Sequence, residues 1–87
     1  MISVVIPSYN REKTIKRAVE SVLNQTYSDI EVIVVDDKST DNTKDVVKSI
    51  EDKRVKYIKL KKNSGACAAR NRGIIESKGE YIAFQDS

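Results

Sequence analysis

The chain has 87 residues, of which 39% are hydrophobic and 33% charged, and its formal net charge is +3 at pH 7. This composition is typical of one small globular domain, or of part of a larger one, over residues 1–87. The single cysteine excludes an internal disulfide and a Cys-based zinc site, and the lack of histidine excludes a Ser-His-Asp triad and His-ligated metals. Any metal here would therefore be a hard cation held by oxygen ligands, such as Mg²⁺ or Mn²⁺.

The sequence offers no signal for a membrane span, for secretion or for nucleic-acid binding. Its longest apolar runs fall far short of the about 20 residues that cross a bilayer, and residues 1–6 lack the basic start of a secretory signal. We therefore expect a cytoplasmic location, or one at the cytoplasmic face of a membrane. The densest basic cluster, residues 59–62, has no interleaved aromatic residues to stack on bases, so nucleic acid is not an expected partner.

The first half of the chain predicts two strands and two helices. Residues 4–6 form an apolar run typical of a strand buried on both faces, which Pro7 is expected to end because it cannot donate to a strand ladder. Asn10 is expected to cap the next helix. That helix carries one apolar stripe, formed by Ile15, Ala18, Val19, Val22 and Leu23. A second strand at residues 30–35 and a shorter helix around residues 46–50 follow.

The second half predicts a strand at residues 55–58, a turn at 63–65, a helix at 66–77 and a strand at 81–84. Gly79 is expected to be the C′ glycine of that helix, and Cys67 to be a small residue packed beneath it. A glycine inside a helix costs about 1 kcal/mol relative to alanine, so Gly73 indicates close backbone packing.

The order β-α-β-α-β-α-β, with short links, requires parallel strands and right-handed crossovers. We therefore predict an α/β, Rossmann-like half-domain with a mostly parallel sheet and helices on both faces. In such a sheet, ligands bind just outside the carboxyl ends of the strands.

Acidic residues stand at two of these predicted strand ends: Asp36 and Asp37 after the second strand, and Asp86 after the fourth. Carboxylates in this position are suited to a ribose hydroxyl or a metal ion, although capping of the next helix would also explain part of the acidic loop. The chain has no glycine before Gly65, which excludes a glycine-rich dinucleotide fingerprint and a P-loop at the first turn.

Two further segments face the same predicted edge. The loop that contains Pro7, Ser8 and Tyr9 can place an aromatic ring with a polar tip there, although it also reads as a plain loop. Arg70 lies about one turn into the third helix, where a guanidinium can hold a diphosphate. The alternative to anion binding is that Arg70 and Arg72 each form an ion pair on the protein surface.

These segments, taken in order, resemble the N-terminal part of inverting family-2 glycosyltransferases with a GT-A fold. The matching stretches are Val-Val-Ile-Pro-Ser-Tyr-Asn at 4–10, Ser-Val-Leu-Asn-Gln-Thr-Tyr at 21–27, the acidic strand end at 31–41, Asn-Ser-Gly with Ala-Arg-Asn-Arg-Gly at 63–73, and Tyr-Ile-Ala-Phe-Gln-Asp-Ser at 81–87. Each stretch alone is weak, but the ordered set covers nearly the whole chain and is specific.

The resemblance implies a nucleotide-sugar donor, commonly a UDP-sugar, and transfer to an acceptor hydroxyl of a glycan or lipid-linked glycan with inversion. It implies that Tyr9 and Asp37 line the uracil and ribose site, with Pro7 and Ser8 supplying backbone and Asp36 beside it. Arg70 would lie near the phosphates. Asp86 would be the first acid of a D-x-D motif that holds Mn²⁺ or Mg²⁺.

The rest of that motif, the acceptor half and the catalytic base are expected beyond residue 87, so we expect no catalytic residue and no turnover in this chain. We also expect residues 81–84 to be an unpaired apolar edge that promotes self-association. Two other functions stay open: a response-regulator-like signalling domain, although its acid pair usually follows the first strand, and a non-catalytic interaction module without nucleotide affinity.

Overall fold

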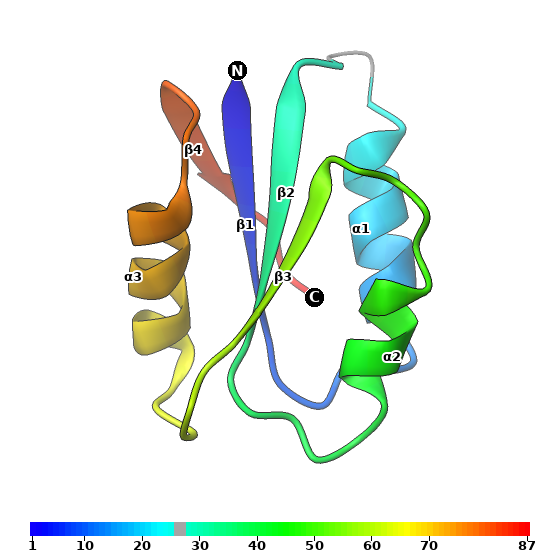
Figure 1. Ribbon diagram of the computed structural model, residues 1–87, viewed down its shortest axis with the longest axis vertical. Coiled ribbons are helices and arrows are strands. Elements are labelled where there is room, and N and C mark those ends of the chain that lie inside the picture. Colours follow the sequence, from blue (N-terminus) through cyan, green and yellow to red (C-terminus); the bar gives the residue numbers. More distant parts are fainter. Residues whose placement is uncertain (26–27) are drawn as a thin grey trace.

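The computed structural model describes residues 1–25 and 28–87, which form alternating strands and helices in the predicted order (Figure 1). The elements are β1 (Ile2–Ser8), α1 (Ile15–Leu23), β2 (Ile30–Asp36), α2 (Thr43–Lys48), β3 (Val55–Lys59), α3 (Ala66–Glu76) and β4 (Tyr81–Phe84). The last two residues of the 21–27 stretch, Thr26 and Tyr27, lie outside the described residues.

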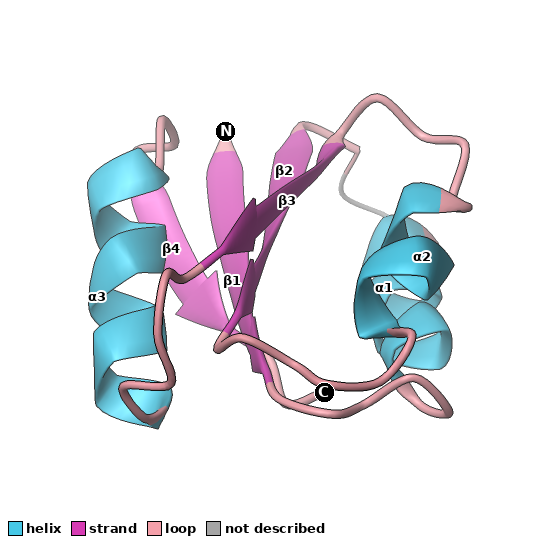
Figure 2. Cartoon of the chain, turned by 60° about the horizontal axis from the view of Figure 1, so that its bottom comes forward, coloured by secondary structure: helices cyan, strands magenta, loops and turns pink. Residues whose placement is uncertain are grey.

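The four strands form one sheet in the order β3-β2-β1-β4, and every neighbouring pair is parallel. Helices α1 and α2 cover one face of this sheet, while α3 covers the other (Figures 1 and 2). The predicted fold class is confirmed, with a sheet whose described strands are all parallel. None of the described helices is long and apolar enough to span a membrane.

Two hydrophobic cores, one on each face, hold the layers together. Along β2, Val32 and Val34 belong to the core under α1 and α2, whereas Ile33 and Val35 belong to the core under α3. Successive side chains of a strand point to opposite faces, which is why a strand covered on both sides needs an unbroken apolar run. Gly73 lets α3 approach the sheet: a Cβ atom there would lie 2.3 Å from Val5 Cγ1, so the predicted close packing is confirmed.

Strand β1 does not end at Pro7, contrary to the sequence-based expectation. Pro7 pairs with Val35, and Ser8 pairs with Asp36. Gln85 N–H donates to the Val5 carbonyl at 3.1 Å, so the backbone polar groups of Val5 point toward β4. Two residues further along the strand, the backbone nitrogen of Pro7 points to the same side. Because β4 ends at Phe84, opposite Val5, the missing N–H of Pro7 costs no ladder hydrogen bond.

Asn10 is not the N-cap of the first helix. Helix α1 begins at Ile15, with Thr14 at the N-cap position. Asn10 instead lies in the left-handed region with a φ of 53°, and its Oδ1 accepts a hydrogen bond from Thr40 N–H at 2.8 Å. An asparagine side chain serves equally well at a cap or in a turn, so sequence alone does not separate the two roles.

Two expectations at the third helix are also wrong. Gly79 is not a C′ glycine, since α3 ends at Glu76 and leaves through Ser77 in an extended conformation. Glycine is required at 79 because a Cβ atom there would lie 2.7 Å from Ser3 Oγ, whose oxygen accepts the Gly79 N–H. Cys67 is exposed on the outer side of the helix instead of packed beneath it.

A buried carboxylate joins the strands at the amino end of the sheet. Glu31 accepts hydrogen bonds from Ser3 Oγ at 2.5 Å and Lys78 N–H at 2.7 Å, and its other oxygen meets Lys56 Nζ at 2.7 Å. Burial alone would raise the pKa of Glu31, but the hydrogen bonds from Lys56, Ser3 and Lys78 outweigh it and lower that pKa to about 2. This network therefore ties β1, β2, β3 and the α3–β4 connection together.

Candidate functional site

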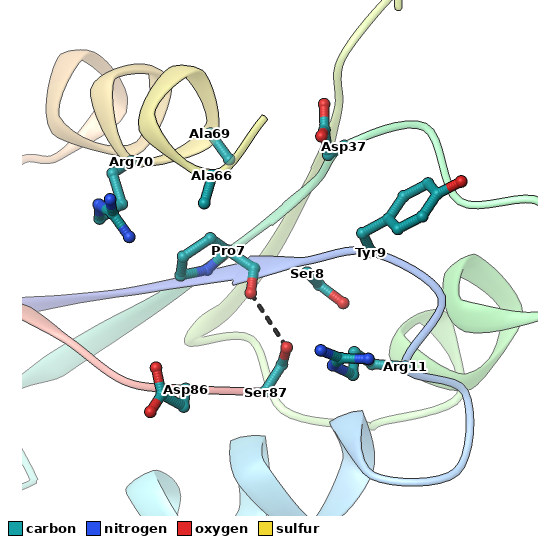
Figure 3. Close-up of a pocket in the computed structure, with 10 residues that line it drawn as sticks. All are labelled: Pro7, Ser8, Tyr9, Arg11, Asp37, Ala66, Ala69, Arg70, Asp86 and Ser87. Carbon is teal, nitrogen blue, oxygen red and sulfur yellow. Dashed lines mark hydrogen bonds between the residues drawn. The ribbon is translucent and has the colours of Figure 1, made fainter. Parts of the chain in front are cut away.

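A cleft of about 400 Å³ lies at the carboxyl ends of β1 and β2, between the start of α3 and the segment after β4 (Figure 3). Its lining residues are Pro7, Ser8, Tyr9, Arg11, Asp37, Ala66, Ala69, Arg70, Asp86 and Ser87. The structure thus brings together every predicted site residue except Asp36. This is the edge where open α/β sheets bind ligands.

Asp37 is the most firmly held carboxylate of the cleft. Its Oδ1 accepts Ser64 N–H at 2.7 Å and its Oδ2 accepts Gly65 N–H at 2.9 Å, and the residue is 5% exposed. Gly65 has a φ of 91°, a conformation that glycine adopts without strain and that lets the chain turn into α3. Each carboxylate oxygen keeps a free lone pair, so Asp37 can still accept a hydrogen bond from a ligand.

The loop after β1 supplies the opposite wall. Tyr9 is 43% exposed, so its aromatic ring is accessible to a flat ligand such as a base. In Figure 3, Tyr9 and Asp37 lie toward one end of the cleft, and Arg70 and Asp86 toward the other. An elongated ligand with a ring at one end and phosphates at the other would match this distribution of groups.

Arg70 projects from the first turns of α3. Within the described residues, its guanidinium makes one weak polar contact, from Nη2 to Cys67 Sγ at 3.6 Å, and forms no ion pair. Arg72 does form a surface ion pair, with Glu76 at 3.2 Å. The surface-pair alternative therefore holds for Arg72, while the Arg70 guanidinium remains free to meet an anion.

Arg11 also lines the cleft and was not predicted from the sequence. It follows Asn10, whose left-handed conformation turns the loop back toward the sheet edge. An arginine two residues beyond Tyr9, in an irregular loop, carries no pattern that would single it out. Its place in the cleft adds a second guanidinium to the site.

Asp36 does not line the cleft, although the sequence predicts it as a nucleotide-binding residue. It is 1% exposed, and its Oδ1 accepts both Ser39 N–H at 2.8 Å and Ser39 Oγ at 2.5 Å. Its Oδ2 accepts a hydrogen bond from the hydroxyl of Tyr57. Burial, together with this contact, raises the pKa of Tyr57, which keeps the phenol protonated as the donor.

Asp86 contributes one carboxylate to the cleft, and that alone does not make a metal site. Within residues 1–25 and 28–87, no three acidic or cysteine side chains lie close enough together to bind a metal ion. Mg²⁺ and Mn²⁺ prefer several oxygen ligands, so the residues described here do not by themselves fit either ion.

A family model described as "Glycosyl transferase family 2" matches residues 3–87 of the chain. This chain belongs to glycosyltransferase family 2. Its curated relatives include the Escherichia coli protein named UDP-Glc:alpha-D-GlcNAc-diphosphoundecaprenol beta-1,3-glucosyltransferase WfaP, 47% identical over 87 residues. Another is the putative teichuronic acid biosynthesis glycosyltransferase TuaG of Bacillus subtilis, 44% identical over 89 residues. The match covers 100% of this chain but only 35% of either relative.

Solved structures of similar proteins share the fold. TarS 1-349 of S. aureus in complex with UDP has a TM-score of 0.91 and 38% identity, over 99% of this chain and 27% of that one. The mannosyltransferase PcManGT of Pyrobaculum calidifontis, in complex with GDP-Man and Mn²⁺, has a TM-score of 0.84 and 26% identity, over 93% of this chain and 25% of that one. The predicted family and the GT-A-like fold are therefore confirmed, and the response-regulator alternative has no support. The roles of the individual cleft residues stay predictions.

Proposed function

We propose that this glycosyltransferase family 2 chain binds the nucleotide part of a nucleotide-sugar donor, with UDP as the nucleotide. The observation that carries the proposal is the convergence of Tyr9, Asp37 and Arg70, distant in sequence, on one cleft at the sheet edge. The similarity to TarS, which has been solved with UDP and with UDP-GlcNAc, supports a uridine nucleotide.

The chemistry of the cleft assigns a role to each group. The Tyr9 ring would stack on the uracil, and Asp37 would accept a hydrogen bond from the uracil or the ribose. Pro7 and Ser8 would shape the floor with their backbone. Arg70, without a carboxylate partner among the described residues, would meet the diphosphate.

We propose that a divalent cation, Mn²⁺ or Mg²⁺, binds at Asp86 only together with the donor. The support is the position of Asp86 in the cleft and the Mn²⁺ bound to the related mannosyltransferase. One carboxylate is too little for such an ion, so the diphosphate and further protein ligands would have to complete its shell.

For the whole protein we propose transfer of the sugar to a hydroxyl of a glycan or lipid-linked acceptor, with inversion. The chain spans about a third of the length of relatives such as WfaP and TuaG, and a family member's acceptor site and catalytic base are expected outside these residues. We therefore propose that these 87 residues bind the donor without turning it over. The cytoplasmic location stays a prediction.

The test is an amide NMR titration of the chain with UDP, first without and then with Mg²⁺. We expect shifts centred on Tyr9, Asp37 and Arg70, and a further response at Asp86 only when both UDP and Mg²⁺ are present. Replacing the carboxylate in Asp37→Asn should weaken UDP binding by about tenfold, because a charge-assisted hydrogen bond becomes a neutral one.

Asp29→Asn is the matched control, since Asp29 lies at the opposite end of the sheet, exposed beside the amino terminus at 3.2 Å. It should leave UDP binding unchanged. A folded spectrum in which UDP moves no resonance would overturn the proposal and favour a non-catalytic interaction module.

A further inference from the structure

Two loops at the cleft are tied to each other by side-chain hydrogen bonds. One is the β1–α1 loop, which carries Tyr9 and Arg11; the other is the β2–α2 loop, which begins at Asp37. The two loops lie about 30 residues apart in the sequence, yet six hydrogen bonds join residues 10–12 to the β2–α2 loop and to Thr43, the first residue of α2. The β1–α1 loop supplies Tyr9 and Arg11 to the cleft and the β2–α2 loop supplies Asp37, so the relative position of the two loops affects the shape of the cleft.

The first connection runs from Asp36 through Ser39 to Asn10. Asp36 accepts the Ser39 hydroxyl at 2.5 Å, and the same Ser39 oxygen accepts Asn10 N–H at 2.8 Å. A serine hydroxyl has one proton to donate, and an ionised carboxylate can only accept. Asp36 therefore fixes the direction of the Ser39 hydroxyl and leaves its lone pairs facing Asn10.

The second connection runs back from the β1–α1 loop. Asn10 Oδ1 accepts Thr40 N–H at 2.8 Å and Asp41 N–H at 3.3 Å, which holds Asn10 at its φ of 53°. Asp41 Oδ2 accepts Glu12 N–H at 3.2 Å, and Thr43 Oγ1 accepts Arg11 N–H at 3.0 Å. The backbone N–H groups of residues 10 to 12 thus donate to three different side chains, two from the facing loop and one from Thr43 at the start of α2.

We propose that Asp36 and Ser39 are positioning residues, which hold Asn10, and with it Tyr9 and Arg11, in the geometry that binds the nucleotide. Neither residue lines the cleft, and Asp36 is buried with both of its carboxylate oxygens hydrogen-bonded within the protein. This inference rests on the proposed function for its effect on UDP, but the loop geometry itself can be measured without ligand.

The experiment compares Ser39→Ala with Ser49→Ala by amide NMR, in the free protein and in a UDP titration. Ser49 is the matched control, because its hydroxyl donates to Val46 O at 2.6 Å on the exposed end of α2 and reaches neither loop. Ser39→Ala should shift and broaden the amides of residues 9–12 in the free protein and weaken UDP binding at least fivefold. Ser49→Ala should do neither, and Ser39→Thr, which keeps a hydroxyl, should restore both readouts.

A second variant, Asn10→Gly, covers the case in which Ser39→Ala fails to fold. Glycine adopts the left-handed conformation readily but removes the Oδ1 acceptor, so the same loss of UDP affinity is expected. Equal UDP affinity in Ser39→Ala and Ser49→Ala, with unchanged amides at residues 9–12, would overturn the inference. If the unmodified chain binds no UDP, the proposed function fails, while the ligand-free comparison still decides whether the positioning network exists.

Discussion

At the residue scale, the adjacent acids Asp36 and Asp37 take different roles because a strand alternates its faces. Asp36 shares a face with Val34 and meets Tyr57 on the side of α1 and α2. Asp37 follows directly after β2, where its N–H still donates to the Ser8 carbonyl at 2.8 Å, and its carboxylate meets the loop that starts α3. The sequence predicts two acids at a strand end; alternation then decides that one enters the cleft and the other is enclosed.

The acidity of Glu31 gives a prediction for stability. Its pKa is lowered from 4.5 to about 2 in the folded chain, so Glu31 stabilises the fold fully above about pH 4.5 and loses that effect as the pH falls toward 2. The shift corresponds to a contribution on the order of 3 kcal/mol. We expect Glu31→Gln to lower the free energy of unfolding at pH 7 and to flatten its pH dependence between pH 4.5 and 2.

Urea unfolding at a series of pH values measures this effect. Glu51→Gln, at an exposed position outside the strands and helices, is the control and should keep the acid dependence of the unmodified chain. The same steep acid dependence in Glu31→Gln would show that another carboxylate is responsible.

At the element scale, the contact between α3 and β1 is where small residues matter most. In a free helix, Gly→Ala stabilises by about 1 kcal/mol, but a Cβ at position 73 would lie 2.3 Å from Val5 Cγ1. Because the helix would have to move away from the sheet, we expect Gly73→Ala to lower the free energy of unfolding by about 1–3 kcal/mol.

Thermal unfolding followed by circular dichroism measures the change, with Ile75→Ala as the control on the same helix, where the side chain is 75% exposed. The control should change the midpoint little. A midpoint that rises in Gly73→Ala would mean that the two elements are packed less closely than the structure shows.

At the scale of the whole molecule, β4 is one of the two edge strands of the sheet, the other being β3. Strand β4 pairs with β1 on one side only, and its apolar side chains are exposed, with Tyr81 at 69% and Phe84 at 49%. An unpaired apolar strand invites pairing with another chain. We propose that the isolated chain self-associates through β4, so its mass by light scattering should rise with concentration toward that of a dimer.

Tyr81→Lys should prevent this, because a charge on an edge strand opposes pairing. Ile75→Lys, which places the same charge on the outer side of α3, is the matched control and should leave association intact. A monomer mass at every concentration would contradict the proposal, and loss of association in Ile75→Lys instead would assign the contact to the helix.

The sequence by itself determined the order of the elements, the parallel sheet and the family, because apolar runs, turn residues and ordered motifs are local signals. It also determined most of the cleft, since the carboxyl ends of parallel strands always meet at one edge. Only the tertiary structure decided which groups face inward there. Four features depend on contacts between segments distant in the chain. They are the continuation of β1 through Pro7, the loop role of Asn10, the burial of Asp36 and the position of Arg11 in the cleft. Such contacts leave no periodicity in the sequence, so no local pattern could have predicted them.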